Sequence, residues 1–185
     1  MQAIFVYIYC LPLWHTAALI FIFAGCWRWM VQKKGSSVSR KAVLCAKAIF
    51  AALLFLWGAA ILWQTILSRN PGVPSAHWEP FYQLRAYFAG GDRELLRTLW
   101  MNLLLFIPGG FMMAAVLPRR WRSVWLVLAF ILLTGFSAAI EAKQFCDGLG
   151  LAETDDILCN GLGAILGITI EEFGMLPAHK KECKQ

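Results

Sequence analysis

Long apolar runs separated by short polar segments dominate the pattern of this chain. Five runs are long enough, or nearly so, to cross a hydrocarbon core about 30 Å thick, which takes about 20 helical residues. They cover approximately residues 4–26, 42–67, 99–117, 124–140 and 157–176. The runs lack the period-two alternation of barrel strands, and in lipid only helices and closed barrels satisfy the backbone. The pattern therefore predicts an all-α bundle of about five transmembrane helices, formed by a single domain over residues 1–185.

The first run could be taken for a signal peptide, and the third run contains a proline–glycine segment that could end a helix. The first run, residues 4–26, is too long for the core of a cleavable signal peptide, and no basic residue precedes it. We therefore expect it to be a retained helix. The third run contains Pro108-Gly109-Gly110, which we expect to kink the helix rather than end it.

Composition supports the membrane interpretation. Hydrophobic residues make up 59% of the chain and charged residues 15%, and there are nine Trp and 13 Phe. Soluble domains average roughly 45–50% apolar and about 25% charged residues. The polar surface is too small to cover a soluble globule, and so apolar a chain is not disordered. The lipid bilayer is therefore the predicted surrounding of this protein.

The basic residues predict an orientation. The net charge is +6, but the basic residues form short clusters beside the apolar runs, which is not the layout of a nucleic-acid-binding surface. If five helices alternate, one side receives 12 basic residues, namely Arg28, Lys33, Lys34, Arg40, Lys41, Lys47, Arg119, Arg120, Arg122, Lys180, Lys181 and Lys184. The other side receives five, namely Arg69, Arg85, Arg93, Arg97 and Lys143. The positive-inside rule then places the N-terminus outside and the C-terminus, with the tail 177–185, in the cytoplasm.

The loop between the second and third runs, residues 68–98, is rich in aromatic residues. Trp78, Phe81, Tyr82 and Phe88 alternate with polar residues, as in a helix that lies at a membrane surface. Gly90-Gly91 would end such a helix. We expect an interfacial loop or helix on the outer side, which serves either as an anchor or as a lid over a site between the helices.

Several polar side chains fall at one predicted depth. Asn102 lies one turn into the third run, and Glu141 and Gln144 end the fourth at the same side. Asp156 and Asn160 lie at the start of the fifth. Polar groups at membrane depth are costly and usually face a bundle interior or a water-filled cavity. The five residues are therefore predicted to form a binding site, and Glu141 and Asp156 are also candidate catalytic carboxylates.

Other residues of the fifth run favour structural roles. Asp155 is expected to cap this helix, because a carboxylate complements the helix dipole and accepts from free amides. Gly163 and Gly167 form a small-xxx-small surface on which a neighbouring helix can pack closely. Glu171 and Glu172 are expected to form a solvated helix end.

The sequence contains no motif for a metal, a phosphate loop or a nucleophile. The three His are far apart, so no metal ligand set and no cofactor is predicted. The six Cys form no CxxC pair, although Cys146 and Cys159 flank one loop and could pair in an oxidising compartment.

Three blocks of the chain, in order, resemble the VanZ-like family of small bacterial integral membrane proteins. Residues 102–110 resemble its N-xx-LF-x-P-x-G block, and residues 141–144 resemble its E-xx-Q block. Residues 156–167 resemble its D-xxx-N-xx-G-xxx-G block, and the resemblance extends back to Arg69. The chain departs from the family at Gly150, where relatives commonly have an arginine; an arginine of the second loop could take its place.

The resemblance implies a multi-pass protein of the bacterial cytoplasmic membrane with a link to envelope chemistry. The founding member of the family is associated with low-level resistance to the glycopeptide teicoplanin. Three functions follow as hypotheses. The protein binds an amphipathic envelope lipid, glycan or glycopeptide; or it is an acid–base enzyme that uses Glu141 and Asp156 on a lipid-linked or glycan substrate; or it has a purely structural or assembly role.

Overall fold

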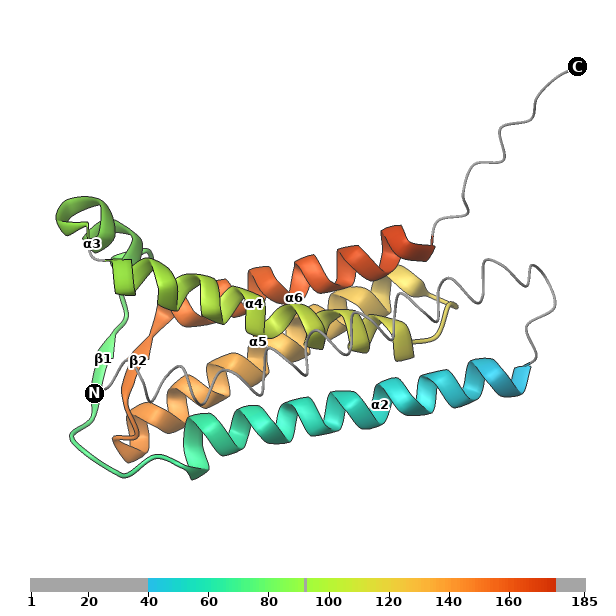
Figure 1. Cartoon of the computed structure of the whole chain (residues 1–185), viewed down its shortest axis with the longest axis horizontal. Coiled ribbons are helices and arrows are strands. Elements are labelled where there is room, and N and C mark those ends of the chain that lie inside the picture. The colour runs from blue at the N-terminus through green and yellow to red at the C-terminus, as the bar shows by residue number, and fades with distance from the viewer. Residues whose placement is uncertain (1–39, 92, 176–185) are drawn as a thin grey trace, which may run out of the picture.

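The structure is a computed structural model that describes residues 40–91 and 93–175. Its elements are, in order, α2 (Arg40–Leu62), the π-helical turn η2 (Trp63–Leu67), β1 (Ser75–His77), α3 (Tyr82–Gly90), α4 (Arg93–Val116), α5 (Arg122–Asp147), β2 (Leu151–Glu153) and α6 (Thr154–Met175). The long helices α2, α4, α5 and α6 run side by side, while β1, β2 and α3 gather at one end, which we call the sheet end (Figure 1). We call the opposite end, where α4 ends and α5 begins, the Arg122 end.

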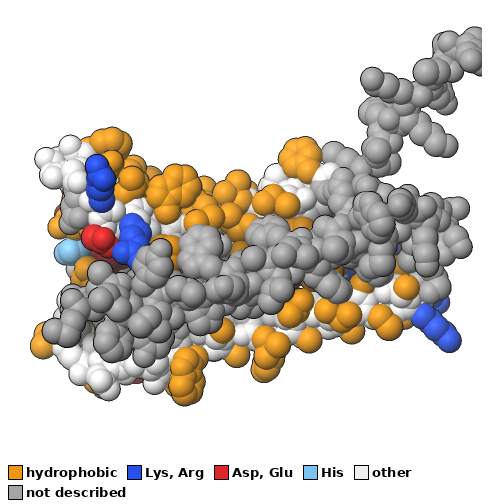
Figure 2. Space-filling view, viewed as in Figure 1, with side chains coloured by type: hydrophobic (Ala, Val, Ile, Leu, Met, Phe, Trp, Pro, Cys, Tyr) orange, Lys and Arg blue, Asp and Glu red, His pale blue; other side chains and the backbone are white. Residues whose placement is uncertain are grey.

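The helices have the length and apolar character of membrane spans. Three segments are long and apolar enough to cross a membrane: Arg40–Leu67, Arg93–Val116 and Arg122–Asp147. Apolar side chains cover much of the flank of the bundle that Figure 2 shows. Large apolar residues on the described helices, among them Phe55 and Leu132, are exposed. Lipid, rather than water, is the solvent in which such side chains are stable. The prediction of a mostly helical membrane protein is therefore confirmed, with three candidate spans among the described residues.

Three of the five predicted spans coincide with these three segments, and α6 is a helix over most of the predicted fifth span. The predicted first span, residues 4–26, and the tail 177–185 lie outside the described residues. The third span runs through Pro108 as one helix, as expected, since α4 ends only at Val116.

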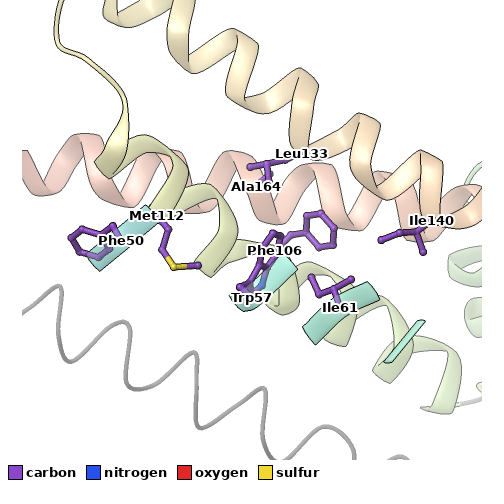
Figure 3. Packing of buried hydrophobic residues seen from close by; sticks show 8 residues of the cluster. All are labelled: Phe50, Trp57, Ile61, Phe106, Met112, Leu133, Ile140 and Ala164. Carbon is purple, nitrogen blue, oxygen red and sulfur yellow. The ribbon is translucent and has the colours of Figure 1, made fainter. Parts of the chain in front are cut away.

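An aromatic cluster packs the middle of the bundle. The rings of Trp57 on α2 and Phe106 on α4 meet edge to face (Figure 3), with their centroids 5.2 Å apart. The ring centroid of Phe136 on α5 lies 6.2 Å from that of Trp57. The Trp57 indole also donates a 3.1 Å hydrogen bond to the carbonyl oxygen of Leu105. Trp57 thus fills the space between helices and satisfies its polar atom at once.

Small residues bring the backbones of α4 and α6 into contact. A Cβ atom at Gly163 would lie 2.1 Å from the carbonyl oxygen of Leu103, and one at Gly167 would lie 2.0 Å from that of Ile107. Both distances are far below van der Waals contact. The close approach fixes the two helices in register, and so sets the depth of the polar residues near their sheet ends.

A two-stranded parallel sheet, which the sequence did not predict, joins the loops at the sheet end. β1 pairs with β2, and His77 lies opposite Glu153. The amide of Gly72 extends the contact by donating to the carbonyl oxygen of Gly148 at 2.7 Å. The loop after α2 is therefore held against the loop after α5.

The Arg122 end differs from the expected solvated helix end. Glu171 is only 2% exposed, and its carboxylate lies 2.6 Å from the Arg122 guanidinium, which also binds Glu172. Arg122 donates in addition to the carbonyl oxygen of Ala114 at 2.8 Å. The expectation was wrong because a buried carboxylate is tolerated when an arginine neutralises it and closes a helix C-terminus as well.

The α4–α6 contact predicts the effect of a single methyl group. Gly163→Ala should lower the free energy of unfolding by about 1–3 kcal/mol, because the added Cβ must push the helices apart. The measurement is the thermal midpoint of the purified full chain in detergent. Gly135→Ala is the matched control: it lies in α5 with no atom near its Cβ position, so it should be neutral or stabilising. Equal midpoints for the two variants would contradict the contact.

The buried ion pair predicts a second stability effect. Arg122→Gln leaves Glu171 without its cation, and such a loss costs about 3 kcal/mol or more. The neighbouring exposed Arg120→Gln removes the same charge and should change the thermal midpoint little. An unchanged midpoint for Arg122→Gln would mean that the ion pair is not formed.

Candidate functional site

Charged and polar side chains gather at the sheet end, beside the apolar flanks of the bundle (Figure 2). This end receives the first turns of α4 and α6, the last turns of α5, the strands β1 and β2, and the helix α3. The polar groups therefore come from segments far apart in the sequence. The buried ones among them, such as Gln83 and Glu141, need hydrogen-bond partners within the protein.

Asp155 fixes the position of α3. It is 3% exposed, and its carboxylate accepts hydrogen bonds from the backbone amides of Phe81 and Gln83, the latter at 2.8 Å. Phe81 has φ 60, an uncommon conformation for a residue with a Cβ, and the two hydrogen bonds hold it there. Asp155 was expected to cap its own helix. It does lie in the first turn of α6, but the amides that it accepts are those at the N-terminus of α3, which are directed at the carboxylate.

Gln83 is the residue of α3 that enters the site. It is 1% exposed, and its Nε2 donates to Glu153 Oε2 at 2.6 Å and to Asp156 Oδ1 at 3.4 Å. Its Oε1 has no hydrogen-bond partner among the described residues. One amide thus bridges two carboxylates and leaves one buried acceptor unused.

Glu153 connects the sheet to the helices. Its carboxylate lies 3.5 Å from Nδ1 of His77, its partner across the sheet, and its own amide donates to Glu141 Oε2 at 3.0 Å. Burial raises the pKa of the Glu153 carboxyl above its ordinary value, because desolvation outweighs the stabilising contacts with Gln83 and His77. The charge of Glu153 is therefore only partly compensated.

Glu141 and Asp156 lie close enough to repel each other electrostatically. The Arg69 guanidinium attracts Glu141, but its own hydrogen bond, 3.2 Å long, goes to the carbonyl oxygen of Leu149. Across residues 40–91 and 93–175, no lysine or arginine forms an ion pair with Glu141 or Asp156. Within the described part of the chain, two acidic side chains thus share a site without a bonded cation.

The structure brings three of the predicted site residues together. Asn102 lies near enough to Asp156 to stabilise its carboxylate, although its Nδ2 makes no hydrogen bond of normal geometry to a described residue. Glu141 joins them from α5. Asn102, Glu141 and Asp156, together with Glu153 and Gln83, form what we call the carboxylate cluster.

The other two predicted site residues make contacts between segments of the fold. Gln144 donates to the carbonyl oxygen of Thr65 at 3.1 Å and so ties α5 to the π-helical turn η2. Asn160 donates to Ser137 Oγ at 2.8 Å and joins α6 to α5 one turn further into the bundle. The predicted packing residues Gly163 and Gly167 face α4, as described above.

Sequence reasoning missed Gln83 and His77 as site residues and gave no role to Glu153. Gln83 stands among aromatic residues in a loop, and nothing local indicates that it turns inward. His77 and Glu153 become neighbours only through the pairing of β1 with β2. The one sequence signal that could have indicated a role for Glu153 is that acidic residues 153, 155 and 156 lie close together in the chain.

The arrangement provides carboxylates and amides, without a recognisable metal site. Among the described residues, no group of three or more His, Cys, Asp or Glu side chains could hold a metal ion. Cys146 and Cys159 are both free thiols, so the pairing considered from the sequence is not formed.

A comparison with protein-family models finds one family, VanZ/LLP1, whose model matches residues 44–173. Neither the curated proteins nor the solved structures contain a match to this chain. The matched region includes every helix and strand named above except the ends of α2 and α6, and it contains the whole carboxylate cluster. The chain is therefore a transmembrane protein that belongs to the VanZ/LLP1 family.

Proposed function

We propose that this protein binds the polar head of an amphipathic cell-envelope molecule through the carboxylate cluster. The observation that carries the proposal is that buried and half-buried polar groups from five separate segments converge at the sheet end. Glu141 and Asp156 form no ion pair with a lysine or arginine in the described part of the chain. Purely structural carboxylates are normally neutralised, as Glu171 is by Arg122. A ligand head can provide the missing partners.

The cellular setting of the proposal is the bacterial cytoplasmic membrane, with five spans, the N-terminus outside and the C-terminus inside. Arg40 and Arg120 lie at the Arg122 end, whereas Arg69 and Arg93 lie at the sheet end, in keeping with the predicted split of 12 basic residues against five. This orientation turns the carboxylate cluster towards the envelope. Family membership supports the location.

Exposed aromatic side chains beside the cluster suit the apolar part of such a ligand. Trp78, Phe81 and Tyr82 are exposed next to the buried Gln83. The Trp78 carbonyl oxygen accepts from Thr154 Oγ1 at 3.1 Å, which holds this aromatic segment against the start of α6. The exposed aromatic residues suit the predicted interfacial anchor. The hydrogen bonds of Gln83 to Glu153 and Asp156 attach this segment to the site, as the alternative role of a lid would require.

A catalytic function is the alternative that one observation favours. Glu141 and Asp156 lie within electrostatic reach of each other, as paired carboxylates do in acid–base catalysis. Binding and catalysis differ in whether the bound molecule is changed. A structural or assembly role differs from both in requiring no bound molecule.

Substitutions that replace a carboxylate with an uncharged amide of the same shape test the proposed binding. Asp156→Asn and Glu141→Gln should each reduce by about tenfold or more the envelope amphiphile that co-purifies with the full chain, because each removes a charge-assisted contact. Native mass spectrometry in mild detergent measures the bound molecule. Glu79→Gln, an exposed acid on the same surface, is the matched control and should retain it.

The same experiment separates the three functions. If both variants lose folded protein in step with the bound molecule, the carboxylates hold the bundle together and the binding proposal fails. If the wild type converts the bound molecule and Asp156→Asn does not, the site is catalytic.

Thiol labelling tests the proposed orientation. In a variant that keeps Cys183 and has serine at the other cysteines, an impermeant thiol reagent should label only opened membranes, because the tail is cytoplasmic. A cysteine placed at Glu79, which is exposed at the sheet end, should be labelled in intact cells. The reverse pattern would contradict the orientation.

A further inference from the structure

We propose that the carboxylate cluster recognises a primary ammonium group, and therefore that the ligand is an amphiphile with an amine in its head. This inference rests on the proposed binding function and specifies its chemistry. It follows from the charge of the cluster, from an unused buried acceptor and from the weak contacts of Asp156.

The charge of the cluster favours a cation. Of the three carboxylates in the cluster, that of Glu141 is within electrostatic reach of the Arg69 guanidinium, and that of Glu153 lies 3.5 Å from the His77 imidazole. The Asp156 carboxylate has no ion pair with a described lysine or arginine. The fourth carboxylate, that of Asp155, is already satisfied by the α3 amides. Burial, together with the neighbouring carboxylates, raises the pKa of Asp156; a cation would favour its charged form, whereas an anionic head would disfavour it.

The unused acceptor favours a cation that donates hydrogen bonds. Gln83 is almost completely buried, and Nε2 must face Glu153 and Asp156 because the opposite orientation would set Oε1 against two carboxylates. Oε1 is therefore a fixed acceptor without a donor. A buried acceptor without a partner costs free energy, which a donor from the ligand would recover. An ammonium group has three N–H donors, whereas a quaternary ammonium has none.

Among the carboxylates of the cluster, that of Asp156 has the greatest remaining capacity to accept hydrogen bonds. Glu141 accepts a backbone amide at 3.0 Å and Glu153 accepts an amide at 2.6 Å, but the Gln83 contact with Asp156 is 3.4 Å long. That length exceeds the usual range for an N–H···O hydrogen bond. The Asn102 amide also stabilises Asp156, without a hydrogen bond of normal geometry. Asp156 also stands at the start of α6, beside the segment that carries Trp78. We therefore place the ammonium nitrogen at Asp156 and the apolar chain along Trp78, which is 52% exposed.

Two kinds of envelope molecule present this chemistry, namely a lipid whose head group is an amine and a lipid-linked glycan that carries an amino sugar. They share the ammonium and the apolar chain. In the amine lipid the ammonium lies a few bonds from the apolar chain, whereas in the lipid-linked glycan the ammonium of the amino sugar lies further from it.

A set of matched probes tests the inference on the purified full chain in dodecyl maltoside. Dodecylammonium should bind at least tenfold more tightly than dodecyltrimethylammonium, which has the same chain and charge but no N–H donor. Short-chain phosphatidylethanolamine should likewise exceed short-chain phosphatidylcholine. Glucosamine, without a chain, reports whether the amine alone suffices and so separates the two sources. Native mass spectrometry titrations give the dissociation constants.

Three variants connect the binding to the cluster. Asp156→Asn should weaken dodecylammonium at least tenfold, and Glu153→Gln provides a second variant should the first fail to fold, as judged by its thermal midpoint. Glu79→Gln removes the same charge outside the cluster and should bind as the wild type does.

The outcomes separate this inference from the proposed function. If dodecyltrimethylammonium binds as tightly as dodecylammonium, the ammonium inference is wrong. The proposed function still stands in that case if the cluster variants weaken both probes. If no probe depends on Asp156 or Glu153, both proposals are overturned.

Discussion

The constraint on which this structure depends is that carboxylates at the end of an apolar bundle must find hydrogen-bond donors or cations. Asp155 meets it by accepting the free amides of α3, which fixes that helix against α6. Glu141 meets it through the amide of Glu153, which the pairing of β1 with β2 brings into place. The helix, the strands and the side chain of Gln83 at the sheet end are thus arranged around acidic groups. Their positions follow from charge as much as from apolar packing.

The two ends of the bundle meet this constraint differently. At the Arg122 end, an arginine binds Glu171 and Glu172 directly and also closes the C-terminus of α4. At the sheet end, backbone and side-chain amides take most of that role, and Arg69 acts on Glu141 without an ion pair. Glycines pack α4 closely against α6, so the polar groups near their sheet ends are held close together. That rigid, partly uncompensated charge is what distinguishes a candidate binding site from a structural ion pair.

The sequence predicts the helical part of this architecture. Of the site, it predicts Asn102, Glu141 and Asp156 but not Gln83, His77 or Glu153. Hydrophobic runs are sufficient for the long helices, and the spacing of Gly163 and Gly167 indicates the face of α6 that meets α4. Helical periodicity also places Glu141 and Asp156 at one level. It cannot reveal that residues 75–77 and 151–153 pair, because each strand has three residues and no alternation. Gln83 and His77 reach the site only through that pairing and through the capping of α3, and Glu171 is buried only because Arg122 comes from another helix.

Cross-linking of the two strands tests most directly whether the sheet end closes around the carboxylates. Ala76 and Ala152 are partners in the parallel pair, and neighbouring strands lie about 4.8 Å apart, within the range that a disulfide spans. Cysteines at these two positions, in a chain otherwise free of cysteine, should form a disulfide in native membranes, identified by mass spectrometry of the linked peptides. A cysteine at Ala89, near the end of α3, paired with the one at position 152 should remain unlinked. Linking of the second pair without the first would contradict the account.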